Sequence, residues 1–117
     1  MSLQLPTGIE QRLVRHRLAR CTATLQELRE DLRITREQHD IMRDDAADSA
    51  LRAIVAETPS AEFEHRDTQR HFVAISTHLA HLEAAIADHE REIDSLLDRL
   101  HSTDTTEPGD SSQRHES

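Results

Sequence analysis

The sequence predicts an all-α protein, an antiparallel two-helix coiled-coil hairpin, and two observations lead to this fold class. Apolar residues recur in alternating steps of three and four along two stretches, the spacing of a helix that packs against a partner helix. The chain of 117 residues also has only two Gly, three Pro, two Phe and no Trp or Tyr. That is too few turn formers and aromatic residues for a sheet sandwich. A chain of this length forms at most one domain.

The first helix is expected to begin at Thr7, after a flexible N-terminus of residues 1–6. Thr7 and Glu10 form a capping box, in which a hydroxyl caps the helix and a carboxylate follows three residues later. The first seam of apolar and small side chains then follows the helix. It consists of Val14, Leu18, Cys21, Leu25, Leu28, Leu32, Thr35, His39, Met42 and Ala46.

A break in the first helix is expected near residue 45, so that this helix covers residues 7–45. The acidic, small-residue run from Asp44 to Ser49 favours a stop there, although a helix that continues to Glu57 remains an open alternative. With the break, residues 48–57 form a short capping helix at the tip of the hairpin. The apolar residues that this short helix would bury near Phe63 are Leu51, Ile54 and Val55.

The next long helix is expected over residues 59–101. Thr58 is a good N-cap, and Pro59 suits the first turn because its φ is already helical and its missing N–H would have no partner there. The second seam consists of Ala61, His65, Thr68, Phe72, Ile75, Leu79, Leu82, Ile86, His89, Ile93, Leu96 and Leu100. Residues 102–117 hold no apolar side chain, which predicts a disordered acidic tail.

The register of the hairpin is predicted by matching polar seam residues with polar ones, because an unpaired polar group in a seam costs about 1–3 kcal/mol. If the first helix stops early, His39 faces His65 and Leu32 faces Phe72, so that like meets like. If the first helix is unbroken, His39 faces Thr77, which lies outside the second seam. We therefore expect a register that pairs His39 with His65.

Self-association is expected as well, because a two-helix hairpin buries only one stripe of each helix. Ordering the backbone costs about 1–2 kcal/mol per residue, and so narrow a core hardly offsets this cost. Two hairpins would pair into a helical bundle as a homodimer. The apolar residues beside the seams that would widen the contact are Ile34, Val73, Ala84, Ala85 and Ala87.

The charge distribution indicates a protein partner. A net charge of −9 argues against nucleic-acid binding, which needs an excess of positive charge. Two groups of charged residues are expected to bind an unidentified protein partner: a basic patch at the start of the first helix and acids at the expected tip. The basic patch is Arg12, Arg15, Arg17 and Arg20, and the tip acids are Asp44, Asp45 and Asp48.

One metal site is conceivable, and no other cofactor and no catalytic residue are expected. Glu62 and His65 are three residues apart, a spacing that directs both side chains toward one ion from one helix. The predicted register adds His39, so these three residues could hold a divalent metal. The competing interpretation is a polar His39–His65 layer that fixes the register, as a buried Asn does in coiled coils.

The stretch from Asp48 to His65 resembles the second-helix segment of encapsulated ferritins. These are two-helix chains that pair into a ferritin-like bundle and oxidise iron inside a protein compartment. The resemblance implies iron ligands at Glu62 and His65. Leu32 stands where that family carries a Glu ligand on its first helix, which argues against ferroxidase activity.

Two looser resemblances concern the chain as a whole. The acidic tip is similar to the coiled-coil hairpin of Gre-type transcript cleavage factors, which implies binding to RNA polymerase through the tip acids. The second globular domain of that family has no counterpart here. The overall pattern also resembles small uncharacterised coiled-coil proteins of actinobacteria, a resemblance that implies no activity.

The predicted function is that of a non-enzymatic interaction or regulatory protein that forms homo-oligomers and binds a protein partner. The alternatives are a ferritin-like metal-binding protein and a hairpin that binds RNA polymerase. No run of about 18 apolar residues could span a membrane. The first residues also lack the charged and apolar regions of a signal peptide, so a cytoplasmic location is expected.

Overall fold

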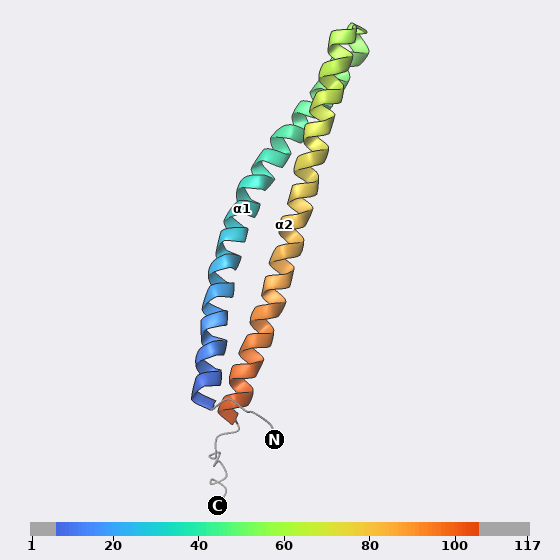
Figure 1. The fold of residues 1–117 in the computed structure, drawn as a ribbon. Helices are drawn as coiled ribbons and strands as arrows, with labels where there is room; N and C mark the ends of the chain where they lie inside the picture. The colour runs from blue at the N-terminus through green and yellow to red at the C-terminus, as the bar shows by residue number, and fades with distance from the viewer. Residues whose placement is uncertain (1–6, 106–117) are drawn as a thin grey trace, which may run out of the picture. The chain divides into compact units, whose positions relative to one another are not determined.

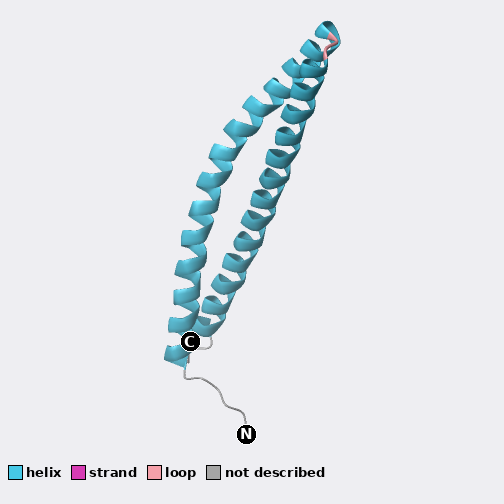
Figure 2. Ribbon diagram, turned by 45° about the horizontal axis from the view of Figure 1, so that its top comes forward, coloured by secondary structure: helices cyan, strands magenta, loops and turns pink. Residues whose placement is uncertain are grey.

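In the computed structural model, which describes residues 7–105, two long helices pack against each other as an antiparallel hairpin (Figure 1). Helix α1 (Thr7–Ala56) has 50 residues and helix α2 (Pro59–Thr105) has 47. Within the described range only the short connection between them is not helical, and no strand occurs (Figure 2). The predicted all-α helical hairpin is therefore confirmed.

The contacts of the chain divide it into two units, and each unit contains a segment of both helices. The first unit joins residues 1–26 to residues 87–117, of which 7–26 and 87–105 are described. The second unit consists of residues 27–86 and includes the turn between the helices.

Both predicted seams form the buried faces of their helices. Every seam residue is buried or half-buried, from Val14 to Ala46 on α1 and from Ala61 to Leu100 on α2. The best-covered side chain of the first unit is Leu96, which is 1% exposed. The alternation of three and four therefore identifies the packed face of each helix correctly.

The predicted break near residue 45 is wrong, because α1 continues without interruption to Ala56. The segment contains neither Gly nor Pro, and its alanines are the strongest helix formers. The first seam also continues at its own spacing through three small buried residues. Ala46, Ser49 and Ala53 are 6, 0 and 6% exposed.

The separate capping helix over residues 48–57 is therefore not formed. Its apolar side chains, which were expected to be buried, lie on the outside of α1, where Leu51, Ile54 and Val55 are 63, 70 and 82% exposed. Phe63 on α2, the expected neighbour of these residues, is 58% exposed. Leu51, Ile54 and Val55 are out of phase with the first seam, so a continuous α1 must direct them away from α2.

The predicted register is also wrong. His39 lies beside Phe72, with ring centroids 5.1 Å apart, where Leu32 was expected. His65 contacts Ser49 instead of His39. The cause is the uninterrupted α1, which moves the turn from about residue 45 to residue 57, so that each residue of α2 meets a later residue of α1.

Ion pairs join the two helices beside the seams. In the first unit Arg17 bonds to Glu92 at 2.6 Å. In the second unit the pairs are Arg36–Glu83 at 3.5 Å and Arg52–Glu64 at 3.2 Å. Exposed pairs of this kind contribute at most about 1 kcal/mol each. Their larger effect is on register and orientation, because flanking charges select how coiled-coil helices align.

The turn is built from one left-handed residue and one capping residue. Glu57 has a φ of 53°, and its N–H donates to the Ala53 carbonyl at 3.1 Å, which ends α1. Thr58 precedes a proline and is therefore kept out of the helical region. Its Oγ1 accepts the Ala61 N–H at 3.1 Å, and its carbonyl accepts the Glu62 N–H at 3.0 Å. The predicted start of the helix at residue 59 is confirmed.

Replacing Thr58 with Ala is expected to lower the free energy of unfolding by about 0.5–2 kcal/mol, because the Ala61 N–H loses its acceptor. The matched control is Thr77→Ala. Thr77 lies in the middle of α2, is exposed, and donates only to the Val73 carbonyl of its own helix at 3.0 Å. Urea unfolding followed by circular dichroism should show a loss for the first variant and none for the second. Equal losses would contradict a capping role.

The ends of the hairpin agree in part with the predictions. Helix α1 begins at Thr7 as expected, whereas α2 extends to Thr105, so the start of the predicted tail at residue 102 is wrong. The predicted flexible segment 1–6 and the remainder of the tail lie outside the described residues. Neither described helix is long and apolar enough to cross a membrane.

Candidate functional site

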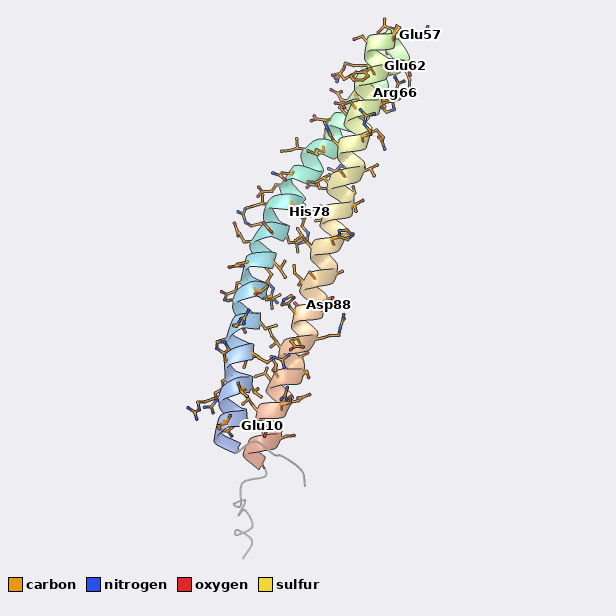
Figure 3. All side chains as sticks on the ribbon, in the orientation of Figure 1. Glu10, Glu57, Glu62, Arg66, His78 and Asp88 are labelled. Atoms are coloured by element: carbon orange, nitrogen blue, oxygen red, sulfur yellow. The ribbon has the colours of Figure 1, made fainter. Side chains whose placement is uncertain are left out.

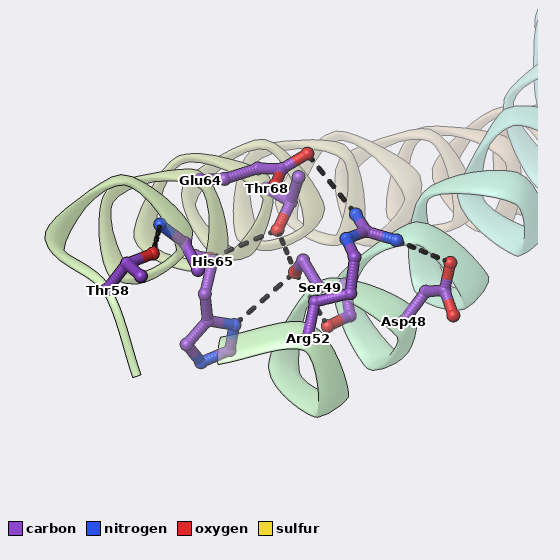
Figure 4. A network of polar contacts seen from close by, with 9 residues as sticks. Asp48, Ser49, Arg52, Thr58, Glu64, His65 and Thr68 are labelled. Carbon is purple, nitrogen blue, oxygen red and sulfur yellow. Dashed lines mark hydrogen bonds and ion pairs between the residues drawn. The ribbon is translucent and has the colours of Figure 1, made fainter. Parts of the chain in front are cut away.

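A buried polar layer lies two turns before the end of α1 (Figure 4). Ser49 is fully buried, and its Oγ lies 2.6 Å from Thr68 Oγ1 and 3.4 Å from His65 Nδ1. The Ser49 hydroxyl also bonds to the Ala46 carbonyl at 3.0 Å. If Ser49 donates to that carbonyl, its oxygen accepts from Thr68 and from a proton on His65 Nδ1. Each polar side chain in the layer then has a partner.

The neighbouring hydroxyl and imidazole are a structural pair rather than a nucleophile and its base. A nucleophilic serine needs an exposed Oγ and a base that takes its proton. Ser49 Oγ is covered completely and directs its proton to a backbone carbonyl. The layer therefore fixes the helix pairing locally, which is the role the sequence analysis assigned to a His39–His65 layer.

The three predicted metal ligands do not come together. His39 contacts Phe72, His65 contacts Ser49, and Glu62 lies 3.9 Å from Arg66. Among residues 7–105, no group of three His, Cys, Asp or Glu side chains is placed to hold a metal ion.

The predicted basic patch is divided by the structure. Arg17 is bound to Glu92 within the hairpin, so its charge is neutralised. Arg12, Arg15 and Arg20 are exposed and form no ion pair with any described residue. Three of the four predicted arginines are therefore available to a partner.

A groove of about 450 Å³ lies beside Arg17 and Arg20 in the first unit. It also contains Cys21, whose thiol donates to the His89 carbonyl at 3.6 Å, and carboxylates of Asp88 and Glu92 line it as well. The mixed charges of the lining select no single class of ligand.

The three predicted tip acids lie within α1 and not at the tip, because the turn is at residue 57. Asp48 precedes the last residue of α1 by more than two helical turns and bonds to Arg52 at 2.7 Å. Asp44 pairs with Arg43 at 3.5 Å, and Asp45 is exposed. The acids at the turn itself are Glu57 and Glu62 (Figure 3).

The most distinctive surface of the described residues is a second groove, of about 410 Å³, at the turn. Leu51 and Val55 of α1 form its apolar side, and Ala61 of α2 lies opposite them. We call Leu51, Ile54 and Val55 the turn patch. These side chains are between 63 and 82% exposed, so most of their apolar area faces solvent. Contiguous exposed apolar surface of this kind marks a site of protein interaction.

Charged side chains border the turn groove and are bound to each other. The Arg52 guanidinium bonds to Asp48 at 2.7 Å and to Glu64 at 3.2 Å. The Glu64 carboxylate, followed by the hydrogen bond to Asp48, raises the pKa of Arg52 above its usual value. Glu57, in contrast, forms no ion pair with any described residue. The groove is therefore lined by apolar side chains and by charges that are already paired, and the unpaired Glu57 lies in sequence between its lining residues Ala56 and Thr58.

The turn patch was not predicted, because its residues were expected to lie in a buried helix. A usable signal was present. Continuing the first seam beyond Ala46 in steps of three and four reaches Ser49 and Ala53, and this phase places Leu51, Ile54 and Val55 outside.

Comparisons of the chain with protein-family models, with curated proteins and with solved structures find no match.

Proposed function

We propose that the protein is a non-enzymatic interaction module of the cytoplasm that binds a basic amphipathic helix of a protein partner in the turn groove. The observation that carries the proposal is the exposure of Leu51, Ile54 and Val55 at 63, 70 and 82% in a chain whose other apolar residues mostly fill the seams. Covering one aliphatic side chain contributes about 1.5–3 kcal/mol, so two or three suffice for a specific contact.

The charge of the surrounding segment supports a basic partner. Between Asp44 and Glu64 the sequence has six carboxylates and one arginine. The last turn of α1 holds no basic residue, so the negative end of the helix is not compensated there. A partner helix that carries apolar side chains beside Lys or Arg would satisfy both features of the groove.

Binding would cost little desolvation of unpaired charge. The charged residues on the wall of the groove, Asp48, Arg52 and Glu64, already bind one another. Glu57 is the carboxylate left for a cation of the partner. Homo-oligomerisation, which the sequence analysis expected, would follow if such a helix occurs in the chain itself.

The proposal is tested with a synthetic helical peptide of Leu and Lys in heptad order, titrated into the full chain and followed by fluorescence anisotropy. We expect the peptide to bind the wild type. The double variant Leu51→Gln/Val55→Thr should bind at least tenfold more weakly, because two apolar contacts of at least about 1.4 kcal/mol together are lost.

The matched control is Ile41→Gln/Val73→Thr, which makes the same kind of change at side chains that are 60 and 53% exposed outside the groove. This variant should bind like the wild type, and a peptide of Leu and Glu should not bind. Equal loss in both double variants, or equal binding of both peptides, would refute the turn groove as the binding site.

A further inference from the structure

The start of α1 carries a second exposed apolar surface, and the charged residues around it are basic, whereas those around the turn groove are mostly acidic. Ile9 and Leu13 are 39 and 50% exposed and four residues apart, so they share one face of the helix. His16 and Arg20 continue this face in steps of three and four, and Arg12 lies beside it. We call Ile9, Arg12, Leu13, His16 and Arg20 the N-terminal face.

The cations of this face are unpaired within the described part of the chain. Neither Arg12 nor Arg20 bonds to a described carboxylate. Between Arg12 and Arg20 the sequence has four arginines and no acid. The chain is acidic, and most other described arginines form ion pairs, as Arg52 does. The start of α1 is thus a basic amphipathic helix that exposes the N-terminal face, and such a helix is the class of partner proposed for the turn groove.

We infer that the turn groove of one copy binds the N-terminal face of a second copy, an inference that rests on the proposed function. Ile9 and Leu13 would lie against Leu51 and Val55, two pairs with the same spacing of four residues. Arg12 would face the unpaired carboxylate of the other copy's Glu57.

Charge favours this unlike contact over a contact between two like surfaces. Two turn patches in contact would bring two unpaired Glu57 side chains and their neighbouring acids together. Two N-terminal faces in contact would do the same with their arginines. Opposed like charges repel each other, whereas the unlike contact pairs arginine with carboxylate. It also places the positive start of one α1 at the negative end of another.

An unlike contact has a consequence that a symmetric one lacks. Each copy retains an unused groove or face after a first contact, so assembly continues until a ring closes or a chain forms. Two variants that are each defective in a different surface therefore retain one intact contact between them.

The test measures sedimentation velocity of the full chain and of two double variants. Leu51→Gln/Val55→Thr disables the groove, and Arg12→Gln/Leu13→Gln disables the face. All four positions are exposed, so the hairpin should stay folded. The wild type should associate, and each variant alone should associate at least tenfold more weakly, for the loss of about 1.4 kcal/mol. An equimolar mixture of both variants should form a one-to-one complex that does not grow.

Several results would overturn the inference. A mixture that stays monomeric while the wild type associates would exclude the unlike contact, as would an Arg12→Gln/Leu13→Gln variant that associates normally. A wild type that stays monomeric yet binds the Leu and Lys peptide would refute the second copy as partner and leave the proposed function intact. Ile41→Gln/Val73→Thr should associate like the wild type, and association should weaken in high salt.

Discussion

Replacing Leu96 with Ala is expected to lower the free energy of unfolding by about 2–5 kcal/mol. Leu96 is 1% exposed and is among the best-covered side chains of the hairpin. Truncation removes apolar contacts and leaves a cavity, and two long helices can close that cavity only by shifting along their whole contact. Small domains are stable by about 5–15 kcal/mol, so this single change removes a large part of the total.

The matched control is the neighbouring residue. Leu97 is 39% exposed on the same helix, so Leu97→Ala loses little burial and gains slightly in helix propensity. Thermal unfolding should separate the two variants clearly, since each kcal/mol shifts the midpoint by about 4–8 °C in a domain of this size. Similar midpoints for both variants would mean that the second seam does not form the core.

Replacing Ser49 with Leu is expected to lower the free energy of unfolding by about 1–3 kcal/mol. Ser49 is 0% exposed and lies against Thr68 at 2.6 Å, so a larger side chain must push α1 and α2 apart. Ser49→Ala should cost less than about 1 kcal/mol, because Thr68 can bond to the His65 carbonyl at 3.1 Å instead.

The control for this substitution is Ala47→Leu, which makes a similar change on the exposed side of the same turn. Chemical denaturation should show a loss for Ser49→Leu and almost none for Ala47→Leu. If the two variants were equally stable, the helices would not approach each other closely at Ser49, and the observed register would be wrong.

Several features of the hairpin could be predicted because they depend on neighbours in sequence. The seam from Val14 to Ala46 follows from the helical period alone. The start of α2 at Pro59 follows from the capping preference of Thr58 and from the fixed φ of proline. These interactions span less than two turns, so the local sequence contains all the information they need.

The end of α1 was misjudged because large apolar residues were given more weight than seam phase. Ala46, Ser49 and Ala53 bury less area than Leu51 or Val55, yet they keep the spacing and allow the helices to approach closely. An acidic run such as that around Asp45 lowers helix propensity by only a few tenths of a kcal/mol per residue. Packing along a seam outweighs this.

The candidate site could be predicted only in part. The basic character of Arg12 and Arg20 was evident from the sequence, and the structure leaves both exposed. The acidic counterpart was assigned to the wrong place, because Asp48 is bound by Arg52 and the turn lies further along the chain. The ion pairs Arg17–Glu92 and Arg36–Glu83 were not predicted, because long exposed side chains can reach partners across the helices in more than one register.

The sequence by itself determined which face of each helix is packed and where α2 begins, because periodicity and capping act over a few residues. Only the tertiary structure decided which residues face each other and which apolar side chains remain outside. The register depends on the difference in free energy between alternative alignments of the two helices. Each alignment sums many small contact energies, such as those of Ser49 against Thr68 and His39 against Phe72. A shift by one heptad preserves the apolar pattern and changes every one of these pairs.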